Sequence, residues 1–281
     1  MELGTEAQGL RASRRNLVRG AAWSVPVVAV ATAAPAFAAS TCASPRSFLL
    51  NWGSVTYNHS GNTSYATVPS SPAGQTIYVH FSTVFRGRGR GDGNIPGSSP
   101  SETRNLSVPP GSGNNGTLQD PVITNLGGLG SGERGVRLQQ ISPQGYNNRQ
   151  DLTVTFRSSP SPSSALVAVQ GLSFSIVDID NLASPAYADR VALSSTVSFD
   201  QTKDDDIRGS GTVNDPWFNA DSGNQNENAA GARVKIDFPD DNLSRISTFT
   251  LSYWTNTGAS GNNTGQYHRI YLSDFSLKTC P

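Results

Sequence analysis

The amino-acid sequence predicts an all-β protein, an antiparallel two-sheet β-sandwich of jelly-roll type with long polar loops. Charged residues make up 15% of the 281 residues, against about 25% in an average soluble domain, and Gly, Ser, Thr and Asn take their place. Aromatic and β-branched residues recur in short bursts between these turn-forming residues. No long stretch repeats its apolar residues with the 3.6-residue period of an amphipathic helix.

Nine or more candidate strands imply two packed sheets. The segments with alternating or continuous β-forming character are 48–57, 76–85, 135–141, 152–156, 172–178, 190–194, 233–238, 247–254 and 267–277. Three of them put three apolar residues on one face, and we expect these to build the core: Leu152-Val154-Phe156, Val234-Ile236-Phe238 and Phe249-Leu251-Tyr253. The long polar loops between strands are of a kind that is often functional or mobile: 86–116, 158–164 and 220–230.

The N-terminus has the three-part layout of an export signal. Arginines between positions 11 and 19 precede an apolar stretch, 21–34, and small residues follow at Ala36-Phe37-Ala38. We therefore expect residues 1–38 to be removed and residues 39–281 to form a single domain. The apolar stretch is shorter than the roughly 20 residues that span a bilayer, so no membrane span is expected in the mature protein.

Within this leader, Ser13-Arg14-Arg15-Asn16-Leu17-Val18-Arg19 resembles the twin-arginine export motif. Leu17 stands where Phe is most often seen, and the Ala/Val/Pro-rich region that follows is similar to actinobacterial leaders. The resemblance implies export as a folded protein. The alternative is an ordinary secretion leader with a chance arginine pair. Both interpretations predict an extracellular or cell-wall-associated protein.

The two cysteines, Cys42 and Cys280, bracket the mature domain. Two cysteines in an exported protein pair by default, and closing so long a loop contributes about 5 kcal/mol in the chain-entropy model. We therefore expect a disulfide that holds the two ends together, which favours one closed unit. An intermolecular bridge and a reactive thiol are the alternatives. Two cysteines without a Cys-x-x-Cys spacing give no zinc or iron–sulfur cluster.

Three aspartates form the most informative cluster. Because side chains alternate along a strand, Asp178 and Asp180 continue the core-facing side of the apolar segment 172–176, and Asp189 has the core-facing parity of the next strand. Three carboxylates at the margin of a core repel one another, and a hard cation would relieve this. Calcium takes six to eight oxygen ligands, which the three aspartates, the Asn181 side chain and loop carbonyls can provide.

Two other interpretations of these residues stay open. In the first, Asp178 caps the loop, Asp180 and Asn181 form the turn, and Asp189 pairs with Arg190 or another arginine. In the second, a pair of the aspartates is catalytic.

The stretch "FSIVDIDN…DRVAL", a later Gly-Ser-Gly and the final "Y…QYHRIYLSDFSL" resemble extracellular β-sandwich modules of secreted and wall-associated bacterial proteins, in which Asp-Ile-Asp follows an apolar strand. The resemblance covers roughly residues 172–277. It implies a binding or surface module and no enzymatic activity.

Four aromatic residues are weaker candidates for a ligand site. Trp217 and Phe218 stand in a turn, and Trp254 and Tyr267 flank a Gly/Asn-rich loop that can open a glycan groove. Exposed rings there can stack on sugars, whereas the alternative is that the rings fill the core.

Charge and motif patterns exclude several classes of function. A formal net charge of zero gives no basic patch for nucleic acid or anionic lipid. No histidine stands in a nucleophile motif, and the only glutamates after the leader are Glu102, Glu133 and Glu227, all in expected loops. The sequence thus predicts a non-enzymatic, calcium-stabilised binding module, exported to the cell surface or medium, for glycan or another envelope component. A glycan-active hydrolase and a purely structural envelope protein are the alternatives.

Overall fold

The structure is a computed structural model that describes residues 44–86, 90–91, 104–112, 121–141, 149–183, 186–221, 223, 226–257 and 268–280. All of these belong to one compact unit, Thr41–Pro281. The expected leader, Cys42 and Tyr267 lie outside the described residues.

Antiparallel strands and a single short 3₁₀ turn make up the regular structure of the described residues. They are β1 (Arg46–Leu50), β2 (Thr56–Ser60), β3 (Thr63–Ser71), β4 (Thr76–Arg86), β5 (Arg90–Gly91), η1 (Leu126–Gly128), β6 (Val136–Ile141), β7 (Arg149–Arg157), β8 (Val169–Val177), β9 (Asn181–Ala183), β10 (Ala186–Ser194), β11 (Asp200–Lys203), β12 (Ile207–Arg208), β13 (Phe218–Asn219), β14 (Arg233–Asp237), β15 (Thr248–Thr257), β16 (His268–Leu272) and β17 (Phe275–Thr279).

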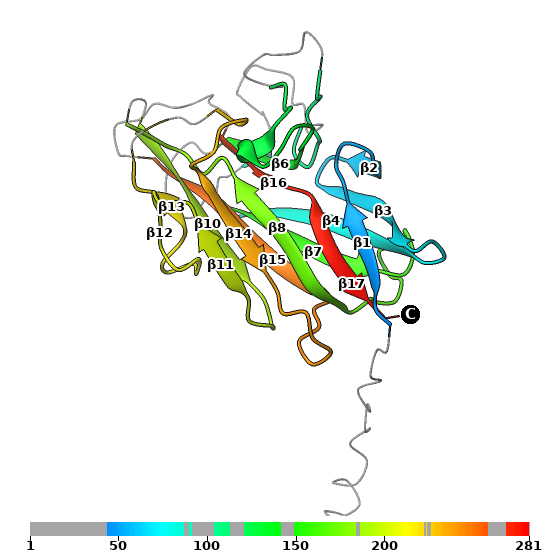
Figure 1. The fold of residues 1–281 in the computed structure, drawn as a ribbon. Coiled ribbons are helices and arrows are strands. Elements are labelled where there is room, and N and C mark those ends of the chain that lie inside the picture. Colours follow the sequence, from blue (N-terminus) through cyan, green and yellow to red (C-terminus); the bar gives the residue numbers. More distant parts are fainter. Residues whose placement is uncertain are drawn as a thin grey trace, which may run out of the picture. The chain divides into compact units, whose positions relative to one another are not determined.

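Most of these strands join one continuous hydrogen-bonded sheet of 15 strands (Figure 1). Its order is β5-β6-β16-β8-β17-β1-β3-β4-β7-β15-β10-β9, with β14 and β11 branching from β8 and β2 from β3. A second sheet in the described part of the chain contains β12 and β13. The predicted all-β, antiparallel fold is confirmed.

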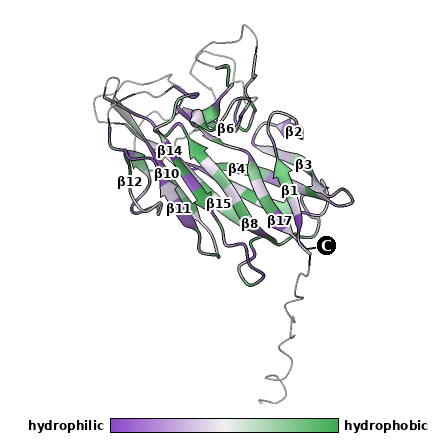
Figure 2. Cartoon of the chain, viewed as in Figure 1, coloured by the Kyte–Doolittle hydropathy of each residue, from purple (hydrophilic) through white to green (hydrophobic). Residues whose placement is uncertain are grey.

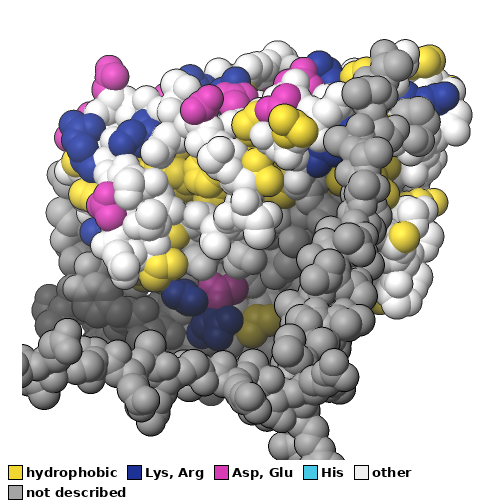
Figure 3. Space-filling model, turned by 90° about the horizontal axis from the view of Figure 1, so that it is seen from below, with side chains coloured by type: hydrophobic (Ala, Val, Ile, Leu, Met, Phe, Trp, Pro, Cys, Tyr) yellow, Lys and Arg dark blue, Asp and Glu magenta, His cyan; other side chains and the backbone are white. Residues whose placement is uncertain are grey.

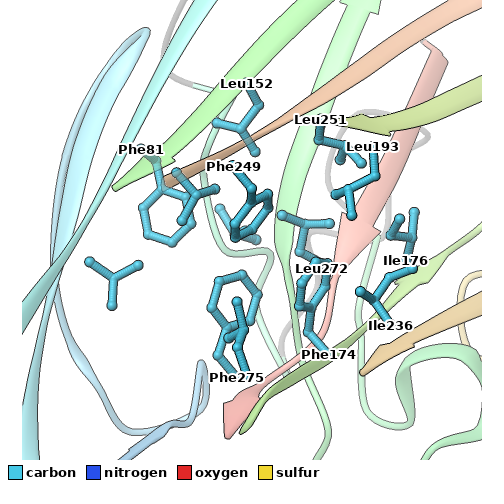
Figure 4. Packing of buried hydrophobic residues seen from close by; sticks show 14 of the residues in the cluster. Phe81, Leu152, Phe174, Ile176, Leu193, Ile236, Phe249, Leu251, Leu272 and Phe275 are labelled. Carbon is cyan, nitrogen blue, oxygen red and sulfur yellow. The ribbon is translucent and has the colours of Figure 1, made fainter. Parts of the chain in front are cut away.

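The core lies between two runs of this sheet, one centred on β8 and β17 and the other on β4, β7 and β15. Phe174 of β8 stacks on Phe249 of β15 with ring centres 5.3 Å apart, and Phe81 of β4 meets Phe275 of β17 at 6.1 Å (Figure 4). Hydrophobic and hydrophilic residues alternate along the strands (Figure 2). All nine residues of the three predicted apolar triplets are buried, because the strand alternation directs them inward.

The first and last strands of the domain are neighbours. β1 pairs with β17 in a register that puts Arg46 opposite Thr279 (Figure 1). Cys280 therefore follows directly on the residue that pairs with the start of β1. This arrangement suits the expected bond to Cys42, which stays a prediction because Cys42 lies outside the described residues.

The expected single strand 267–277 is two strands, β16 and β17. Strand pairing is interrupted at Ser273 and Asp274, which hydrogen-bond to Trp52 instead. The indole Nε1 of Trp52 donates to the Ser273 carbonyl, and its backbone N–H donates to Asp274 Oδ1, each over 2.8 Å. β16 then pairs with β6, whereas β17 pairs with β1. Similarly, the expected strand 48–57 is divided between β1 and β2.

Sequence patterns missed β3 and part of the core. β3 contains Pro69 and many small hydroxyl residues, yet it pairs with β2, β4 and β1. Within the expected polar loop 86–116, Leu106 is fully buried in the core. Asn105 anchors it, because its side-chain oxygen accepts a hydrogen bond from the backbone N–H of Gln139 in β6 at 3.0 Å. Tertiary hydrogen bonds thus fix a segment that has no local strand pattern.

We expect replacement of Phe275 by alanine to lower the free energy of unfolding by about 3–5 kcal/mol. Phe275 is fully buried, and its ring contacts Phe81, Phe174 and Phe249 from three other strands. Urea denaturation measures the change. Leu49→Ala is the control, because Leu49 is 58% exposed and should change stability by less than about 0.5 kcal/mol. Equal effects of the two substitutions would contradict the assigned core.

Candidate functional site

The three predicted aspartates all lie in the interior. Asp178, Asp180 and Asp189 are 4%, 5% and 1% exposed. The Asp189 carboxylate accepts hydrogen bonds at both oxygens. Tyr253 Oη and Thr255 Oγ1 donate to its Oδ1 at 2.9 and 3.3 Å. The Asp180 backbone N–H donates to its Oδ2 at 3.1 Å. Asp189 therefore joins the segment that precedes β9 to β15.

Asp178 has a different environment. Its backbone is left-handed, with φ of +70°, a conformation that only glycine adopts without strain and that Asn and Asp tolerate better than most residues. Its Oδ1 is buried and has no hydrogen-bond partner. Burial, followed by the charges of Asp180 and Glu227, raises the pKa of Asp178 well above its usual range, and burial with the Asp180 charge does the same for Asp189. The nearby cation, Arg269, is paired with Glu227.

Other predicted members of the cluster point elsewhere. The Asn181 side chain donates to the Asn219 carbonyl at 3.0 Å. Arg190 donates to the backbone carbonyl of Asp189 at 2.8 Å, and its guanidinium lies 4.6 Å from the centre of the Phe218 ring. Among the described residues, no three His, Cys, Asp or Glu side chains form a group that can hold a metal ion. Calcium binding therefore stays a prediction without support from the described carboxylates.

The structure does not support the expected aromatic ligand site, because two of its rings are buried. Trp217 is fully buried, with its indole nitrogen donating to Gln201 at 2.5 Å, and Trp254 is 6% exposed. Gly211 seats the Trp217 ring: its φ is +80°, and a Cβ there would lie 2.2 Å from the indole. The Gly-Ser-Gly segment is thus structural. Phe218 is partly buried beneath Arg190.

An open groove of about 590 Å³ is lined instead by residues of β2, β3, β4 and β7. Its central side chains are partly exposed and come from matched positions of neighbouring strands. Asn58 pairs with Tyr65, Tyr65 with His80, and His80 with Thr155. These residues therefore stand in one row across four strands, with side chains on one face of the sheet.

Hydroxyl-bearing residues form the next row of the groove. Ser60 pairs with Thr63, Thr63 with Ser82, and Ser82 with Thr153. The two rows together present aromatic, amide and hydroxyl groups on a rigid antiparallel sheet.

Ring contacts and hydrogen bonds fix the two central rings. Tyr65 stacks on His80, with ring centres 5.5 Å apart and planes inclined by 25°. His80 Nε2 lies 3.1 Å from the Ser159 carbonyl, and because a carbonyl only accepts, Nε2 is the donor. Burial, supported by the charge of Arg157, lowers the pKa of His80 below its usual range, although the bond to Ser159 acts in the opposite direction. His80 is therefore mainly neutral at pH 7.

The Ser/Pro loop 158–164 forms one wall of the groove through Pro160 and Pro162. Ser164 Oγ donates to the carbonyls of Ser159 and Ser161, and Arg157 Nη1 donates to the Ser164 carbonyl. This loop was expected to be functional or mobile. Its internal hydrogen bonds hold it against the strand from which it leaves.

The described residues that line the groove include Arg157, His59 and His80 but neither Asp nor Glu. Elsewhere the charges are mixed: on the face seen from below, acidic and basic side chains are interspersed among uncharged ones (Figure 3). The described lining of the groove thus differs in charge from the face that Figure 3 shows.

Sequence reasoning missed the groove. Tyr65 lies in the unrecognised strand β3, and no sequence motif surrounds His80. A usable signal was present in β4, where Tyr78, His80 and Ser82 alternate with the buried residues Ile77, Val79 and Phe81.

Comparisons with family models, curated proteins and solved structures find no match. In the described part of the chain, no helix has the length and apolar character needed to cross a membrane.

We expect Asp178→Asn to change the pH dependence of stability. Because the pKa of Asp178 is raised in the folded protein, the stability that its carboxyl group contributes is fully present below the unfolded pKa of about 3.9. This stability is lost as the pH rises through the folded pKa. The amide carries no charge, so wild type and variant should unfold at similar temperatures near pH 4. At higher pH the variant should unfold at a higher temperature than the wild type, by about 3 °C for each kcal/mol by which the buried carboxylate destabilises the wild type.

Thermal unfolding from pH 4 to 8 in chelator measures this effect, with the exposed Asp205→Asn as control. A variant less stable than wild type across this range would contradict the expected cost of the buried charge.

Thermal unfolding also tests the calcium prediction. Added calcium should raise the unfolding midpoint of the wild type and leave that of Asp178→Asn unchanged. A wild-type midpoint that does not respond to calcium would exclude the predicted calcium site.

Proposed function

We propose that this protein is an exported, non-enzymatic binding module for glycans and that the β2–β3–β4–β7 groove is its binding site. The observation that carries the proposal is the Tyr65–His80 stack, set among Asn, Ser and Thr side chains on a rigid sheet. An aromatic ring offers an apolar face to the C–H face of a sugar, and the surrounding amide and hydroxyl groups match the donors and acceptors of its hydroxyls.

Two further features support binding in preference to hydrolysis. The described lining of the groove lacks carboxylates, whereas glycosidases generally need two. The groove is also open and lies across strands, which suits a segment of an extended chain. If binding assays find no glycan ligand, the result would favour a structural envelope protein.

We further propose that the fold is a two-sheet sandwich of jelly-roll type. The support is the packing of Phe174 on Phe249 and of Phe81 on Phe275, which brings inward faces of two strand runs together. β1 to β3 is the hydrogen-bonded connection between these runs. A Cys42–Cys280 disulfide would add a covalent closure beside β1 and β17.

Replacing Tyr65 by alanine should weaken glycan binding about tenfold, because a lost ring contact of about 1.4 kcal/mol corresponds to that factor. Tyr65→Phe keeps the ring and should retain most of the affinity. A glycan array finds the best ligand of the mature protein, and calorimetry then compares the variants.

The control for Tyr65→Ala is Leu243→Ala, since Leu243 is 87% exposed and does not line the groove. An array without any bound glycan would overturn the proposed function. Equal affinities of wild type and Tyr65→Ala would show that the glycan binds outside the groove.

For localisation, we propose export by the twin-arginine pathway. Replacing Arg14 and Arg15 together by lysine should abolish export of the full chain from an actinobacterial host while leaving its synthesis unchanged. Immunoblots of medium, wall and cell fractions measure this. Undiminished export of the double variant would favour an ordinary secretion leader.

A further inference from the structure

The groove contains one arginine, Arg157, and its described lining residues include no acidic side chain. Arg157 and His80 come from the neighbouring strands β7 and β4 and are close enough for the arginine charge to affect the histidine. Neither Asp nor Glu is present among the described lining residues, although the whole chain has equal numbers of acidic and basic residues.

We propose that the groove selects polysaccharides that carry carboxylate groups, with Arg157 as the residue that recognises the carboxylate. This inference rests on the proposed glycan-binding function and specifies its substrate class. One guanidinium nitrogen of Arg157 is engaged by the Ser164 carbonyl, which orients the group. A guanidinium has five N–H donors, so the others are available to a planar carboxylate. The Tyr65–His80 stack lies on the same face for the sugar ring.

The protonation of His80 gives this selectivity a pH dependence. His80 Nε2 donates to the Ser159 carbonyl, so Nδ1 of the neutral ring is an acceptor, which repels a carboxylate oxygen, and protonation turns it into a donor. The other titratable or charged side chains that line the groove are His59 of β2, Tyr65 of β3 and Arg157 of β7. Protonation of His80 therefore adds a positive charge near Arg157.

The test uses two forms of one polymer, polygalacturonate and its fully methyl-esterified form, with mature protein at pH 7 in 150 mM salt. A broader panel adds alginate and hyaluronan as acidic polymers, and dextran as a neutral one. We expect the wild type to bind the acid form about tenfold more tightly than the ester, the size of one charge-assisted hydrogen bond of about 1.4 kcal/mol. Binding should tighten as the pH is lowered below 7 while the polymer carboxylates stay ionised, and it should weaken at 500 mM salt.

The variants separate charge from shape. Arg157→Gln should reduce acid-form affinity to that of the ester, whereas Arg157→Lys keeps the charge and should restore part of the difference. Arg208→Gln is the matched control, because Arg208 is exposed on β12 and does not line the groove. Unchanged unfolding midpoints show that the variants are folded.

Equal binding of the acid and ester forms, or binding to neutral polymers alone, overturns the carboxylate inference and leaves the proposed glycan function standing. Acid selectivity that survives Arg157→Gln overturns the role of Arg157. Absence of binding to every polymer overturns both the inference and the proposed function.

Discussion

Side-chain alternation across β3, β4 and β7 is the constraint on which both the core and the groove depend. Ala66, Val79 and Phe156 pair across these strands and are buried. The residues one position earlier on β3 and one later on β4, Tyr65 and His80, pair on the opposite face. A slip of one residue in the register would expose the core side chains and bury the groove row. The energy that fixes the groove geometry is therefore the burial of the apolar face.

The interior is apolar where the aromatic rings meet and polar near the acidic cluster. Gln139 is fully buried, and neither side-chain amide atom has a hydrogen-bond partner; Asp178 Oδ1 is in the same state. Buried groups of this kind cost about 1–3 kcal/mol each. The large ring cluster around Phe249 and Phe275 offsets such costs, so the domain tolerates a polar interior beside the β8–β10 segment that the sequence singled out.

Local patterns were sufficient for the fold class and for the strands with strong alternation. Residues 152–156 and 233–238 are examples, because each apolar residue there is buried for the reason that the pattern gives. Patterns failed where distant contacts decide the structure: Trp52 interrupts 267–277, and Asn105 secures Leu106. At the candidate site, sequence located the buried aspartates correctly but not the partners of Asp189, which are Tyr253 and Thr255 of a strand far along the chain. The Tyr65–His80 pair required the register of an unrecognised strand.

The neighbourhood of β1 and β17 has a consequence for the order of folding. β17 lies between β1 and β8, so the facing edges of these two strands are completed only when β17 pairs with them. The chain between β1 and β17 is long, and contacts that close a long loop form slowly, because the loop entropy is lost before the contacts stabilise the structure. We therefore expect the pairing of β17 to follow the formation of local hairpins such as β3–β4.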